Sequence, residues 1–135
     1  MGRGSDWIPR SRVVLLMTVR RMKTYSGESG IVYQYYFLES QPRRGFWGRR
    51  GTAFRFHVTS DRKNFFVTEV MVEQAALQAW ERRHGRALAE AERYAAAKMA
   101  LFHAFDQSSG PEAVFRIRVS EANIESLLEP LHLDE

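Results

Sequence analysis

The chain of 135 residues has the length of one ordinary domain, which is enough to bury a hydrophobic core without disulfides or metals. Hydrophobic residues make up 44% and charged residues 27%, and the absence of cysteine excludes a disulfide scaffold, a thiol nucleophile and a cysteine-ligated metal. No apolar stretch approaches the length of a membrane span, so we expect a cytoplasmic protein without a membrane partner.

Charge is divided unevenly along the chain, whose net value is +4. Residues 1–63 contain thirteen Lys and Arg against four Asp and Glu, whereas residues 64–135 contain seven against twelve, giving net charges of +9 and −5. Arginine, the side chain suited to bidentate and stacked contacts, outnumbers lysine by 17 to 3. This asymmetry indicates a molecule with a basic side that would meet an anionic partner.

Runs of β-branched and aromatic residues predict four strands in the first half of the chain, after a flexible N-terminal tail at residues 1–10. Polar segments rich in glycine and serine predict the loops between them. The expected strands are residues 11–22, 31–39, 52–59 and 65–67, and the expected loops are residues 23–30, 40–51 and 60–64.

Apolar residues at helical spacing predict two helices in the second half. The first begins with Thr68 as its N-cap and ends at Gly85, and the second spans about residues 87–105. A fifth strand at residues 113–119, a short helix at 121–128 and an acidic tail at 131–135 complete the chain.

The order β-β-β-β-α-α-β-α predicts one α+β domain over residues 11–130. We expect a mostly antiparallel sheet of about five strands, with two main helices packed on one face and a short C-terminal helix.

The segment from Arg43 to Gly51, with the sequence RRGFWGRRG, combines four guanidinium groups, two large aromatic rings and three glycines. Arginine matches phosphate oxygens, aromatic faces stack on bases, and glycine allows a close backbone approach. This combination suits single-stranded nucleic acid. The alternative is an ordinary hairpin tip whose Phe46 and Trp47 pack on the sheet edge while the arginines stay in water.

A second basic surface is expected on the sheet. Arg55 and His57 alternate with apolar residues on the third strand, and Arg116 and Arg118 do so on the fifth. The second strand would add Tyr33 and Tyr35, or Tyr36 in the opposite register. If the strands share an uncovered face, they form a basic, aromatic platform. The alternative is that these arginines are the solvated side of a sheet and the tyrosines belong to its core.

We therefore predict a non-enzymatic module that binds RNA or single-stranded DNA, with no catalytic residue, metal or cofactor, because no motif for these is present. The predicted contacts are Arg43, Arg44, Phe46, Trp47, Arg49, Arg50, Arg55, His57, Arg116 and Arg118.

The alternative function is a protein-interaction or assembly module, in which acidic helices of one copy meet basic strands of another in a homo-oligomer. A third interpretation is a small-molecule pocket between sheet and helices, lined by Phe54, Phe56, Met99 and Phe102. The alternative is that these side chains fill the core and leave no pocket.

Overall fold

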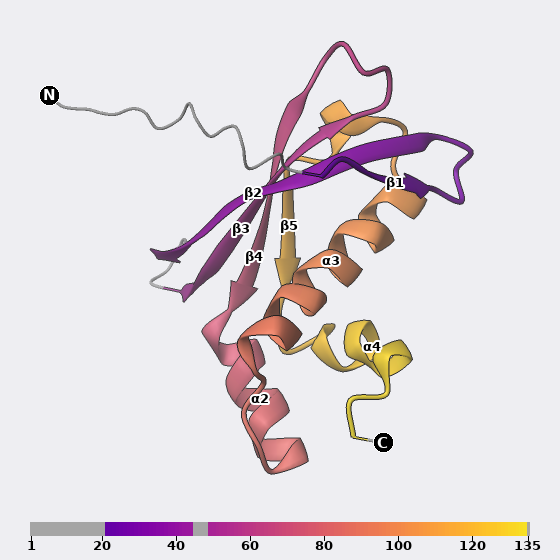
Figure 1. Cartoon of the computed structure of the whole chain (residues 1–135). Coiled ribbons are helices and arrows are strands. Elements are labelled where there is room, and N and C mark those ends of the chain that lie inside the picture. Colours follow the sequence, from indigo (N-terminus) through magenta and orange to yellow (C-terminus); the bar gives the residue numbers. More distant parts are fainter. Residues whose placement is uncertain (1–20, 45–48, 135) are drawn as a thin grey trace, which may run out of the picture.

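The computed structural model describes residues 21–44 and 49–134, and within them it shows the predicted α+β fold (Figure 1). The chain forms a five-stranded sheet, two main helices and a short C-terminal helix, in the predicted order β-β-β-β-α-α-β-α. The elements are β1 (Lys23–Ser26), β2 (Val32–Arg44), β3 (Arg50–Thr59), β4 (Phe66–Glu73), α2 (Gln74–His84), α3 (Glu90–Gln107), β5 (Arg116–Val119) and α4 (Ile124–Leu128).

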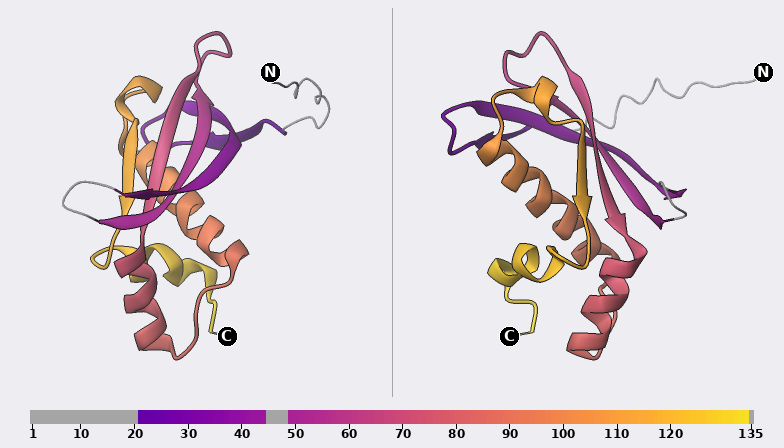
Figure 2. Two further views of the ribbon diagram at one scale, coloured as in Figure 1. Left: turned by 90° about the vertical axis from the view of Figure 1, so that its left-hand side faces the viewer. Right: turned by 180° about the vertical axis from the view of Figure 1, so that it is seen from behind.

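The strands lie in the order of the chain, β1-β2-β3-β4-β5. The first four pair antiparallel, and β5 pairs parallel to β4 after the crossover through α2 and α3. The sheet is curled, and α3 runs along one of its faces, while α4 contacts both α2 and α3 (Figure 1). We call the face toward α3 the inner face and the opposite one the outer face. The left view of Figure 2 looks onto the strands with α3 behind them.

The hydrophobic core lies between the inner face and α3. Phe56 and Val70 on the central strands are completely buried, as are Ala97, Leu101 and Phe105 on the helix. Small alanines on α3 let the helix axis approach the aromatic side chains of the sheet closely. Each large side chain buried here contributes about 1.5–3 kcal/mol through the hydrophobic effect, so the core sets the position of every strand.

The first strand of the sheet is not the expected one. The prediction for residues 11–22 lies outside the described residues, apart from residues 21 and 22, which are not in a strand. Lys23–Ser26, predicted as part of a loop, forms β1 instead. Tyr25 pairs with Tyr33 on β2 and stacks on Phe102 at a centroid distance of 4.4 Å. Tertiary packing of one aromatic ring thus makes a strand from a segment with loop-like composition.

The prediction that a helix begins at Thr68 is wrong, because β4 continues to Glu73. Thr68, Val70 and Val72 are all buried on the inner face, and the Thr68 hydroxyl donates a hydrogen bond to the Val114 carbonyl oxygen at 2.5 Å. Pairing with β3 and β5 satisfies the backbone hydrogen-bonding groups of this segment, so a strand forms here in place of a first helical turn.

From the end of α2 onward, the element boundaries differ from the prediction by three residues or fewer. Helix α2 ends where expected, since Gly85 adopts a left-handed conformation with φ of 79° and donates to the Glu81 carbonyl oxygen. Strand β5 is shorter than predicted, because Pro111–Ala113 forms one turn of 3-10 helix before it. None of the helices in the described part of the chain is long and apolar enough to cross a bilayer.

Candidate nucleic-acid interface

Residues 40–44 and 50–51, predicted to lie in a loop, belong to strands β2 and β3. Strands β2 and β3 continue as a paired ribbon as far as Arg44 opposite Arg50, after a β-bulge between Phe37 and Glu39. The ribbon places Arg43 and Arg44 on one strand and Arg50 on the other, so their spacing is set by the β-ladder. Phe46 and Trp47 lie outside the described residues, and base stacking by them stays a prediction.

One glycine of the RRGFWGRRG segment has a structural role. Gly51 lies directly opposite Glu73 of β4, and a Cβ atom placed on it would be 3.0 Å from the Glu73 Cα atom and closer still to the Val72 carbonyl oxygen. Only a residue without a side chain allows β4 to approach β3 this closely. The glycine is therefore explained by strand packing, without invoking a ligand.

The structure brings the four predicted sheet residues, Arg55, His57, Arg116 and Arg118, onto the outer face. Residues paired across neighbouring strands point to the same side of a sheet. One such row runs Glu39, Arg55, Glu69, Arg116 across β2 to β5, and neighbouring rows contain His57 and Arg118.

The three tyrosines of β2 divide between the two faces. Tyr33 and Tyr35 are buried in the core, whereas Tyr36 pairs with His57 on the outer face. The structure therefore shows the second of the two registers considered from the sequence, in which Tyr36 lies on the outer face.

Glutamates on the same face, missed from the sequence, pair with several of these arginines. Arg43 lies 3.1 Å from Glu69, and Arg49 lies 3.6 Å from Glu73. Arg118 donates to both carboxylate oxygens of Glu73, and this interaction raises the pKa of its guanidinium. Arg55 donates to one carboxylate oxygen of Glu39 at 3.3 Å. The alternating pattern of residues 68–73 was the signal that would have placed Glu69 and Glu73 here.

In three of these four pairs the charges form two layers, whereas Glu39 at 54% is more exposed than Arg55 at 32%. The side chains of Glu69 and Glu73 are 22% and 9% exposed, whereas those of Arg43, Arg49 and Arg118 are 39%, 52% and 53% exposed. The carboxylates lie beneath and the guanidinium groups face solvent. Each arginine has five N–H donors and uses only part of them on glutamate, so donors remain for a second anion. We call Arg43, Arg49 and Arg118 the arginine layer.

Three predicted arginines have no acidic partner among the described residues: Arg44, Arg50 and Arg116. Arg44 and Arg50 are exposed and oppose each other directly across the β2–β3 ribbon. Like charges at opposed positions destabilise a strand pair, and an anion bound between them would relieve this repulsion.

Beside these charges, the outer face carries an aromatic row. Tyr36, His57 and Val67 pair across β2, β3 and β4, and Phe65 adjoins them. The Tyr36 hydroxyl is hydrogen-bonded to His57 Nδ1 at 2.5 Å. The Phe65 ring lies 6.4 Å from that of Tyr36 and 5.8 Å from that of His57. Neither Phe65 nor Val67 was a predicted site residue.

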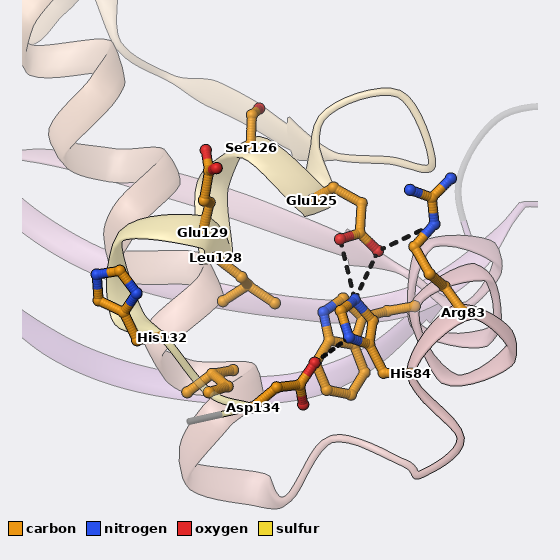
Figure 3. Close-up of a pocket in the computed structure, with 10 residues that line it drawn as sticks. Arg83, His84, Glu125, Ser126, Leu128, Glu129, His132 and Asp134 are labelled. Atoms are coloured by element: carbon orange, nitrogen blue, oxygen red, sulfur yellow. Dashed lines mark hydrogen bonds and ion pairs between the residues drawn. The ribbon is translucent and has the colours of Figure 1, made fainter.

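The other concentration of polar side chains surrounds His84, at a pocket of about 580 Å³ between α2 and the C-terminal residues (Figure 3). His84 stacks on Trp80 and interacts with Glu125 at 3.0 Å and with Asp134. The hydrogen bond to Glu125, followed by that to Asp134, raises the pKa of His84. A neighbouring pair, Arg86 with Glu92, adds a contact to the Leu133 carbonyl oxygen.

The contacts around His84 hold the residues predicted as an acidic tail against α2. Each ring nitrogen of His84 faces a carboxylate, so these contacts connect α2 to α4 and to the C-terminal residues. Within residues 21–44 and 49–134, no group of three or more His, Cys, Asp or Glu side chains has the geometry to hold a metal ion. The candidate interface is the outer face of the sheet, because Arg55, His57, Arg116 and Arg118 gather there.

The suggested small-molecule pocket is occupied by the protein's own core. Phe56 is completely buried and Phe54 nearly so, and both contact the rings of Phe37 and Tyr94. These contacts favour the filled-core alternative.

No protein-family model matches this chain, and neither the curated proteins nor the solved structures contain a match to it.

Proposed function

We propose that the protein is a non-enzymatic nucleic-acid-binding module whose outer sheet face and β2–β3 ribbon contact phosphates. The observation that supports this most directly is the layering of charge, in which the guanidinium groups of Arg43, Arg49 and Arg118 cover the glutamates beneath them. An approaching polyanion meets arginine first. The glutamates restrict the arginine side chains, so less conformational entropy is lost when phosphate binds.

The arginines without acidic partners add positive charge on both sides, because Arg44 and Arg50 occupy the row next to that of Arg43 and therefore point to the side opposite it. Arg44 and Arg50 project from the ribbon, and Arg116 lies on β5 beyond Glu69 in the cross-strand row. On the outer face itself, Arg55, Arg116 and the arginine layer outnumber Glu39, Glu69 and Glu73. The excess of positive charge favours phosphate contacts that release counterions and that weaken as salt increases.

The experiment measures binding of fluorescently labelled single-stranded RNA and DNA of about 15 nucleotides by anisotropy, over a series of salt concentrations. The wild type should bind at low salt, and the logarithm of its affinity should fall linearly with the logarithm of salt concentration. In the double variant Arg44→Gln/Arg50→Gln the slope should decrease by about 1.4, because each lost phosphate contact on a single strand contributes about 0.7.

The matched control is Arg82→Gln/Arg83→Gln on α2, which removes the same charge from another exposed site. It should leave the slope near the wild-type value. Equal losses in both double variants would show a response to net charge alone and would contradict a defined interface. Absence of wild-type binding at low salt would reject the proposed function.

A second candidate, self-association, is favoured by one observation. The row Glu39, Arg55, Glu69, Arg116 alternates in sign, so the same row of a second copy in the opposite direction would be complementary to it. Light scattering at low and high ionic strength tests this candidate. A mass that doubles only at low salt, in a protein that binds no nucleic acid, would support it over the first.

A further inference from the structure

The aromatic row of the outer face exposes more apolar surface than the fold requires. Phe65 and Val67 are 40% and 38% exposed, whereas Tyr33, Phe56 and Phe105 of the core are completely buried. Val67 lies on the same side of β4 as Glu69, and Phe65, just before the strand, has its ring against Tyr36 and His57 of the same face. Apolar side chains grouped on one surface favour a partner that covers them.

The rings of the row are positioned by one another. Tyr36 meets His57 edge to face at 5.2 Å, and the hydrogen bond between the Tyr36 hydroxyl and His57 Nδ1 restricts both rings. Phe65 contacts both at the end of the row. Rings restricted in this way lose little entropy when a flat ligand stacks on them.

Cationic side chains lie on both sides of the row. On one side Arg62, in the β3–β4 turn, donates from Nε to the Gln34 side chain at 2.8 Å. On the other side Arg55 occupies the next cross-strand row. Rows on one face of a sheet are about 7 Å apart, since each is two residues along the strand. The acid of the turn, Asp61, is already used, because its carboxylate accepts the backbone N–H groups of Lys63 and Asn64 at 2.8 Å each.

We propose that Tyr36 and Phe65, positioned by His57, form a base-stacking site that makes the protein selective for single-stranded nucleic acid. The inference rests on the proposed function and specifies its substrate class. A chain lying along the strands would place unpaired bases on the two rings and phosphates at Arg62, Arg55 and the arginine layer beyond. Bases within a duplex are covered by their neighbours, so a duplex offers this site only its phosphates.

The test compares binding of oligothymidylate of about 15 nucleotides with a mixed-sequence duplex of the same length, using the full chain. Tyr36→Leu and Phe65→Ala should each weaken binding of the single strand by about five-fold or more, because one ring is removed in each. Both should leave the affinity for the duplex unchanged, since no phosphate-binding arginine is altered. The matched control is Phe115→Ala, which removes an aromatic side chain that is 52% exposed and lies outside the row.

The outcomes separate the two proposals. If both variants bind the single strand as tightly as the wild type, or lose single-strand and duplex affinity equally, the stacking site is rejected and the phosphate-binding function stands. If the wild type binds neither probe at low salt, the proposed function itself fails and the stacking site with it. Far-UV circular dichroism and thermal melts of each variant exclude a loss of fold as the cause of any change.

Discussion

The Tyr33 hydroxyl provides a sharp test of how the core is packed. Tyr33 is completely buried on the inner face, and its ring stacks on Phe105 with centroids 4.1 Å apart and planes 7° apart. Its hydroxyl oxygen is also buried, and no described residue forms a hydrogen bond with it. The change Tyr33→Phe removes this oxygen and keeps the ring that packs.

We expect this change to stabilise the protein. A buried hydroxyl without a partner costs about 1–3 kcal/mol relative to its hydrated state, and removing it recovers that amount. For a domain of 135 residues, with an unfolding entropy of about 2.1 cal/mol/K per residue, each kcal/mol shifts Tm by about 3–4 °C. The expected increase in Tm is therefore about 3–10 °C.

Urea and thermal denaturation of the two proteins measure the effect, with a shifted urea midpoint and an unchanged dependence on denaturant as the expected pattern. The matched control is Tyr25→Phe, because the Tyr25 hydroxyl donates to the Asp106 carboxylate at 2.9 Å. This variant should lose about 0.5–1.5 kcal/mol. Opposite signs for the two substitutions support the reasoning. A neutral or destabilising Tyr33→Phe would refute it and would show that the hydroxyl is hydrogen-bonded in solution.

Three further predictions concern strand packing and pH. Gly51→Ala should destabilise the protein by about 2 kcal/mol or more in urea titrations, because its Cβ would meet the backbone of β4; an unchanged midpoint would contradict that close approach. Arg86 and the Ala89 N–H lower the pKa of Glu92 to about 2, so Glu92→Gln should be less stable than wild type at neutral pH. That difference should shrink as pH falls from about 4.5 toward 2, as followed by Tm across pH. The pH dependence expected at His84 is opposite, because its pKa is raised in the folded state. The stability that His84 contributes is complete below about pH 6.5 and is lost as pH rises through the folded-state pKa. The difference in Tm between wild type and His84→Gln should therefore shrink as pH rises.

The strands with strict alternation were predictable because burial repeats every two residues. Phe54, Phe56 and Val58 are buried on the inner face as expected, and Arg55 and His57 lie on the outer one. Segments whose apolar residues fit both the two-residue period of a strand and the 3.6-residue period of a helix were not predictable. Val72 belongs both to an alternating run and to a helical one, and only pairing of its strand with neighbours on both sides selects the β conformation.

Composition and periodicity are local properties, and they were enough to predict the α+β class, the order of the elements, the basic first half and the arginines that carry its charge. The pairing of these arginines with glutamates could not be predicted from the sequence. Glu73 and Arg118 are 45 residues apart in the chain and meet because β4 and β5 are neighbours in the sheet. Electrostatic pairing depends on distance in space, so the arrangement of glutamates beneath an arginine layer follows from strand order and register.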